Sequence, residues 1–101
     1  MGRLDGRIAW VTGAGTGIGA ATAERFAAEG ATVVITGRRR EPLEAVADRI
    51  KAAGGTTHVR PADLMKAAQV ADVAGGIARE FGRLDVLVSN AGLNIVERDW
   101  K

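Results

Sequence analysis

The sequence of 101 residues contains no cysteine, no tyrosine and a single histidine. Without cysteine neither a disulfide framework nor a thiolate metal site can form, and one histidine cannot build a multi-histidine zinc site. No apolar run approaches the roughly 18 residues of a membrane span, and residues 1–7 show no signal-like apolar stretch. These absences predict a cytoplasmic protein with no membrane partner.

Neither sign of charge is in large excess, because the chain has 14 basic and 12 acidic residues and a net charge of +2. The two signs are interspersed along the chain, which argues against nucleic-acid binding. Hydrophobic residues make up 47% of the chain and charged residues 26%, close to ordinary globular proportions. We therefore expect one folded domain over residues 1–101.

Short apolar runs alternate with helical patterns along the chain. Strands are predicted at residues 7–12, 31–36, 57–60 and 85–89. Helices are predicted at residues 17–29, from Pro42 to just before Gly54, and in a third segment that Gly82 ends. The predicted apolar faces are Leu43, Val46, Ala47 and Ile50 on the second helix, and Val70, Val73, Ala74, Ile77 and Phe81 on the third.

Strands that alternate with helices through short glycine-marked turns are typical of right-handed βαβ units. The sequence therefore predicts an α/β fold of the Rossmann type, a doubly wound parallel sheet with about four strands and three helices. Trp10 is expected in the core of the first strand, and His58 is expected to be structural.

The segment TGAGTGIG, from Thr12 to Gly19, connects the first predicted strand to the first helix. Backbone N–H groups without partners and the helix dipole attract an anion at such a position. Residues without Cβ let a pyrophosphate approach the backbone closely. A ligand-free tight turn is the alternative, but a turn needs fewer glycines than this loop has.

The pattern Thr12-Gly13-x-x-x-Gly17-x-Gly19 resembles the cofactor signature of the short-chain dehydrogenases/reductases. Asp63-Leu64 and Asn90-Ala91-Gly92 resemble two further elements of that family. The resemblance implies that Asp63 accepts a hydrogen bond from the adenine amino group and that Asn90 braces the sheet near the adenosine ribose. A capping aspartate and a turn asparagine are the alternatives.

NAD-binding folds of this type place an acidic residue at the end of the second strand to hold the ribose 2′-hydroxyl. This chain has Gly37 there, followed by Arg38, Arg39 and Arg40. A guanidinium suits a 2′-phosphate, so NADP(H) is predicted in preference to NAD(H). Arg39 and Arg40 could equally form a solvated basic turn. The predicted cofactor contacts are Thr12, Gly13, Gly15, Thr16, Gly17, Ile18, Gly19, Arg38, Arg39, Asp63, Leu64, Asn90, Ala91 and Gly92.

The resemblance also implies a catalytic tyrosine and lysine that match no residue of this sequence, so no catalytic residue and no turnover are predicted. Family members have about seven strands, which predicts an incomplete sheet. The fourth strand is expected as an edge that favours self-association or docking of a C-terminal half. Two alternatives stay open: a stand-alone nucleotide-binding or interaction module, and a methyltransferase.

Overall fold

The computed structural model describes residues 2–15 and 17–90, and within them the chain forms four strands and three helices. The strands are β1 (Ile8–Thr12), β2 (Thr32–Thr36), β3 (Thr56–Val59) and β4 (Val86–Ser89). The helices are α1 (Gly17–Ala28), α2 (Arg40–Ala52) and α3 (Ala67–Phe81).

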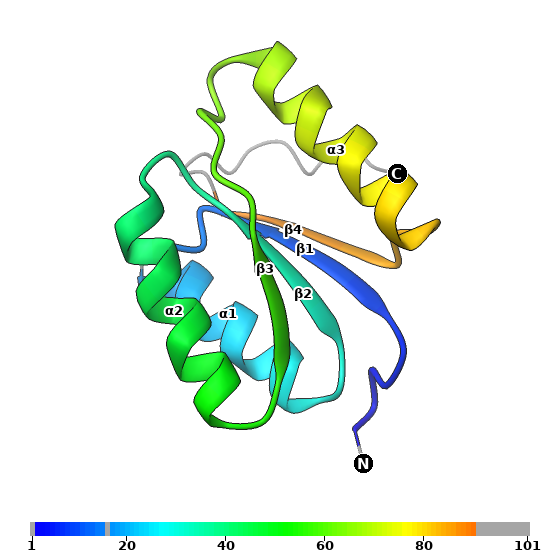
Figure 1. Cartoon of the computed structure of the whole chain (residues 1–101). Helices are drawn as coiled ribbons and strands as arrows, with labels where there is room; N and C mark the ends of the chain where they lie inside the picture. The colour runs from blue at the N-terminus through cyan, green and yellow to red at the C-terminus, as the bar shows by residue number, and fades with distance from the viewer. Residues whose placement is uncertain (1, 16, 91–101) are drawn as a thin grey trace.

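All strand pairs are parallel, and the sheet has the order β3-β2-β1-β4. The chain moves outward from β1 through β2 to β3 and then crosses back to place β4 on the other side of β1. Figure 1 shows α1 and α2 against one face of the sheet and α3 against the other. The predicted Rossmann-type α/β fold is therefore confirmed.

Successive side chains of β1 point to opposite faces of the sheet, which divides the core in two. Ala9 and Val11 lie on the face covered by α1 and α2, whereas Ile8 and Trp10 lie on the face covered by α3. The predicted apolar face of α2 is fully buried on the first of these faces. Trp10 is buried as predicted, and the His58 ring makes an edge-to-face contact with Phe81.

The boundaries differ from the predicted ones by a few residues. α2 begins at Arg40, so Pro42 lies within its first turn, where the missing N–H is tolerated. β4 begins at Val86, and just before it the Asp85 carboxylate accepts the Ile8 N–H at 2.8 Å. The prediction for α3 is partly wrong, because Ala74 is exposed while Ile77 is buried.

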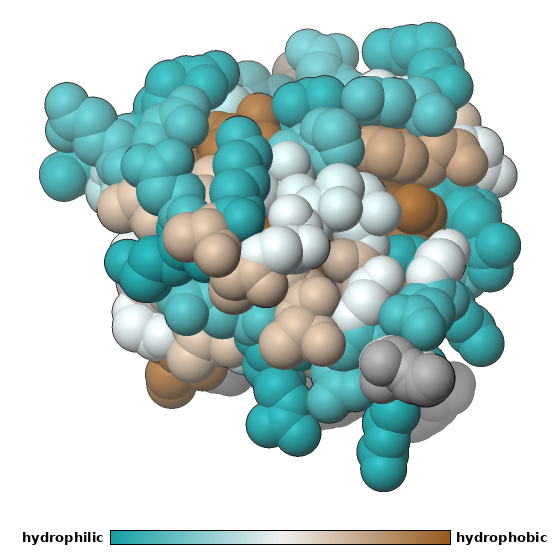
Figure 2. Space-filling view, turned by 60° about the horizontal axis from the view of Figure 1, so that its bottom comes forward, coloured by the Kyte–Doolittle hydropathy of each residue, from teal (hydrophilic) through white to brown (hydrophobic). Residues whose placement is uncertain are grey.

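β4 pairs with β1 and, in the described part of the chain, with no other strand. Its Leu87 side chain is 44% exposed, and Leu84 just before the strand is 42% exposed. The space-filling view in Figure 2 shows hydrophilic residues over much of the surface, with apolar residues exposed between them in small groups. The predicted edge position of β4 matches this arrangement of the described strands.

Candidate nucleotide-binding site

The glycine loop lies where β1 ends and α1 begins, and its glycines have different roles. Gly13 has a φ of 69°, and a Cβ there would overlap the Asn90 carbonyl oxygen. A Cβ on Gly19 would overlap the Gly13 carbonyl oxygen. These two glycines are therefore required by close backbone packing, whether or not a ligand binds.

Gly17 is different, because a Cβ there would meet nothing within 4 Å among the described residues. Gly17 is the first residue of α1, and the next residue, Ile18, is 75% exposed. The first turn of α1 contains no acidic residue that would offset the positive end of the helix dipole. The described residues therefore leave the start of α1 open to an anionic ligand.

The arginine turn, residues 37–39, lies beside the glycine loop at the end of β2. The Ala14 N–H donates to the Thr36 carbonyl at 3.2 Å and joins the two segments. Gly37 is buried, whereas Arg38 and Arg39 are exposed. Arg40 is held by Glu44 at 2.8 Å, but no side-chain hydrogen bond or ion pair holds Arg38 or Arg39 within residues 2–15 and 17–90.

Asp63 lies in the turn between β3 and α3, next to the arginine turn. The Ala62 N–H donates to the Gly37 carbonyl at 2.9 Å, which brings the two turns together. The Asp63 carboxylate accepts the Met65 N–H at 3.0 Å, and the Asp63 N–H donates to Gln69 Oε1 at 2.7 Å. Asp63 thus shapes the turn before α3, although the cap position itself is Lys66. Leu64 is half-buried in the same turn.

Asn90 follows β4 and completes the group of strand ends. Its N–H donates to the Thr12 carbonyl at 3.1 Å, so it lies directly beside the glycine loop. Its side-chain Nδ2 is buried and has no hydrogen-bond partner among the described residues. A buried amide normally has a hydrogen-bond partner. Thr16, Ala91 and Gly92 lie outside the described residues.

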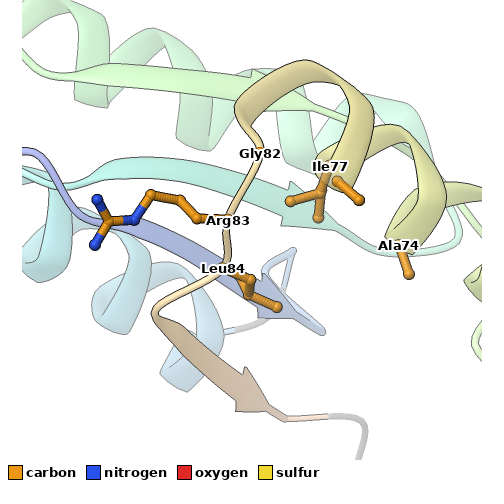
Figure 3. A pocket seen from close by; sticks show the side chains of 6 residues that line it. Ala74, Ile77, Gly82, Arg83 and Leu84 are labelled. Atoms are coloured by element: carbon orange, nitrogen blue, oxygen red, sulfur yellow. The ribbon is translucent and has the colours of Figure 1, made fainter.

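Two hollows lie away from this site, at the end of the sheet where the strands begin. The smaller, about 150 Å³, is lined mainly by apolar side chains such as Ile77 and Leu84. Figure 3 shows the Arg83 side chain extending away from them. The larger lies near the C-terminal ends of α1 and α2 and is lined by Asp5, Glu24 and Arg49, among others. Neither includes a residue of the glycine loop or the arginine turn.

Other kinds of site find no support in the described residues. No group of three or more metal-binding side chains comes together in residues 2–15 and 17–90. In the same part of the chain, no helix has the length and apolarity to cross a membrane. The glycine loop, the arginine turn and the Asp63 turn thus remain as the candidate site, and they were all predicted from the sequence.

The chain is similar to several oxidoreductases. It is 46% identical over 92 residues to an uncharacterized oxidoreductase of Mycobacterium tuberculosis, covering 91% of this chain and 35% of that protein. It is 46% identical over 87 residues to the short-chain reductase protein NovJ of Streptomyces niveus, covering 86% and 33% of the two chains. The chain thus spans about a third of the length of these curated relatives.

Solved structures give the same result. A metagenomic short-chain oxidoreductase in complex with NADP superposes with a TM-score of 0.86 at 47% identity, covering 89% of this chain and 41% of that one. The sequence pattern of the family described as short chain dehydrogenase matches residues 7–100. The chain therefore belongs to the short-chain dehydrogenase family.

Proposed function

We propose that the chain is the cofactor-binding part of an NADP(H)-dependent short-chain dehydrogenase/reductase that acts on an alcohol or ketone. The observation that carries this proposal is the pair of exposed arginines, Arg38 and Arg39, beside an open helix N-terminus. Family membership supports a nicotinamide cofactor, and the similar metagenomic oxidoreductase is in complex with NADP. The preference for NADP(H) over NAD(H) rests on the arginine turn.

Each part of the site has a separate role in this proposal. The first-turn N–H groups of α1 hold the pyrophosphate, and the open space at Gly17 lets it approach the backbone. Arg38 and Arg39 bind the 2′-phosphate as charged donors. The remaining side-chain contacts are Asp63 on the adenine and Asn90 near the adenosine ribose. The proposed contacts are completed by Thr12, Gly13, Gly15, Thr16, Ile18, Gly19, Leu64, Ala91 and Gly92.

Gly37 contributes by its lack of a side chain. It occupies the position where an acidic residue would hold a ribose 2′-hydroxyl. A carboxylate there would repel a 2′-phosphate, and any side chain would press on Leu43, because a Cβ at Gly37 lies 3.3 Å from Leu43 Cδ2. The missing carboxylate favours the more highly charged cofactor, and the contact with Leu43 disfavours a larger residue at this position.

A reduced nicotinamide held by the glycine loop and the arginine turn would supply hydride-transfer chemistry to the carbonyl carbon of a ketone, and the carbonyl oxygen would need a proton. The chain has no tyrosine to donate that proton. Its proposed part in the reaction is to bind and orient the cofactor, and we expect no turnover from the 101-residue chain.

Family membership removes the methyltransferase alternative, but not a stand-alone nucleotide-binding module. The two remaining readings differ in their partners. A cofactor-binding part of a longer enzyme would associate through the β4 edge, with a C-terminal half or with itself. A stand-alone module would bind NADPH as a stable, soluble chain without a second half. We place either form in the cytoplasm.

The direct test is to titrate the chain with NADPH and with NADH, following tryptophan emission and energy transfer to the reduced nicotinamide. Arg38→Asp should weaken NADPH binding about ten- to hundredfold, the value of one charged hydrogen bond, and NADH binding much less. Arg40→Asp makes the same charge change on a side chain already held by Glu44. Equal losses for both cofactors in Arg38→Asp would overturn the assignment.

A further inference from the structure

A buried hydrogen bond joins β1 to the end of β2. The Trp10 indole Nε1–H donates to Thr36 Oγ1 at 2.9 Å, and both side chains are buried. Trp10 lies opposite Val34, two residues before Thr36, so both partners lie on the α3 face. Loss of either partner would leave a buried polar group without its bond, so this contact fixes the end of β2 firmly.

Thr36 is also bound through its backbone. Its carbonyl accepts the Ala14 N–H of the glycine loop at 3.2 Å. The next residue, Gly37, accepts the Ala62 N–H at 2.9 Å, and Arg38 follows directly. One residue therefore has its side chain held by β1 and its carbonyl held by the glycine loop, just before the chain turns into the arginines.

The arginine turn itself has few anchors of its own. Gly37 has no side chain, and within residues 2–15 and 17–90 no ion pair or side-chain hydrogen bond holds Arg38 or Arg39. Thr36 is the last residue before these arginines whose side chain is hydrogen-bonded in the core. The position of the turn relative to the glycine loop thus depends on how Thr36 is held.

We propose that Thr36, held by Trp10, is a positioning residue that sets where the arginine turn lies relative to the glycine loop. It contributes in this way to the discrimination between NADPH and NADH, without touching the cofactor. This inference rests on the proposed cofactor site. Small displacements of a charged donor are sufficient to weaken a hydrogen bond to a phosphate, because such bonds depend steeply on geometry.

The test compares three variants by the ratio of NADPH to NADH affinity. Thr36→Val removes the acceptor of the indole bond at nearly constant volume and should lower the ratio about two- to tenfold, the range that one hydrogen bond allows. Thr36→Ser keeps the hydroxyl and should restore the ratio. Thr57→Val is the matched control, since Thr57 Oγ1 makes a buried bond to the Val33 carbonyl at 2.8 Å, on the other face of the sheet.

Thr57→Val should lower stability much as Thr36→Val does and leave the ratio unchanged. An equal fall of the ratio in both variants would overturn the proposal, because general destabilisation would then explain it. So would an unchanged ratio in Thr36→Val.

Amide hydrogen exchange without cofactor separates this inference from the proposed function. Thr36→Val should speed exchange of the Ala14 amide relative to core amides such as that of Val34, and Thr57→Val should not. If the unmodified chain bound neither cofactor, the proposed function would fail, and Ala14 exchange would still decide whether Thr36 holds the glycine loop. Unchanged Ala14 exchange in Thr36→Val would overturn the coupling.

Discussion

The two faces of the sheet are packed very differently. Among the described residues, 13 buried hydrophobic residues form one continuous cluster on the α1 and α2 face, whereas the cluster on the α3 face has four, Ile8, Trp10, Val34 and Ile77. α1 and α2 also pack against each other, with many alanines that allow close approach. Within α3 only Ile77 is buried, and Val70, Val73 and Phe81 of the same helix are half-buried. The α1 and α2 face therefore provides most of the described core.

The candidate site draws on both faces. Gly19, in the first turn of α1, packs against the Gly13 carbonyl on the well-packed side. Thr36 is held from the α3 side by Trp10. The difference between the faces thus suggests that the dense core holds the glycine loop, while a sparse core with one specific hydrogen bond aligns the arginine turn.

The largest effect should come from removing matched side chains from the two faces. Ile50 and Ile77 are each 3% exposed, one on each face. Ile50→Ala should destabilise the chain by about 3–4 kcal/mol and Ile77→Ala by about 2 kcal/mol, because a sparse surrounding can relax around a cavity. Urea unfolding followed by circular dichroism measures both. A larger loss for Ile77→Ala would contradict the comparison of the two faces.

Most of the fold followed from the sequence because local patterns determined it. Periodic apolar positions and glycine-marked ends predicted every described strand and helix. The buried face of α2 was predicted in full, since Leu43, Val46, Ala47 and Ile50 follow regular helical spacing. The prediction failed at Ala74, which is exposed, because periodicity does not tell how much of a helix face the sheet covers.

The parts of the site that escaped prediction depend on strand register. The Trp10–Thr36 bond joins residues 26 apart and exists because Trp10 pairs with Val34. No local sequence pattern predicts such a contact, although a buried tryptophan usually has a hydrogen-bond partner for its N–H. Similarly, the bond from the Asp63 N–H to Gln69 needs the turn before α3 to be known first.

An intermediate effect on stability is expected at Asp85, just before β4. The Asp85 carboxylate accepts hydrogen bonds from Arg83 at 2.7 Å and from the Ile8 N–H at 2.8 Å. Hydrogen bonding from Arg83, then from the Ile8 N–H, holds the pKa of Asp85 below its ordinary value of 3.8. A lowered pKa adds stability above the unfolded pKa, and this stability is lost as the pH falls through the folded pKa.

Asp85→Asn should therefore lower stability at neutral pH and flatten the fall in stability below about pH 4. Urea midpoints measured from pH 2.5 to pH 7 give this slope. Asp48→Asn, an exposed position on α2, controls for the change in net charge. An unchanged acid slope in Asp85→Asn would show that other carboxyl groups produce the acid sensitivity.

The smallest effect on stability is expected at Leu87, on the sparse face of the β4 edge. Its side chain lies opposite Trp10 in the register and is 44% exposed. Leu87→Glu should change the free energy of unfolding by no more than about 0.5 kcal/mol, because little apolar surface is removed from the core. It should nevertheless reduce self-association in sedimentation velocity, since a charge on an edge strand opposes pairing with another chain.

Met65→Glu is the matched control, because that side chain is 89% exposed and lies far from β4 along the chain. It should leave the sedimentation coefficient unchanged. If the unmodified chain sediments as a monomer at high concentration, the predicted self-association through β4 is wrong. A large loss of stability in Leu87→Glu would mean that the α3 face is packed more tightly than the 44% exposure of Leu87 indicates. With the isoleucine pair, this measurement separates the contribution of the sparse face to folding from its contribution to association.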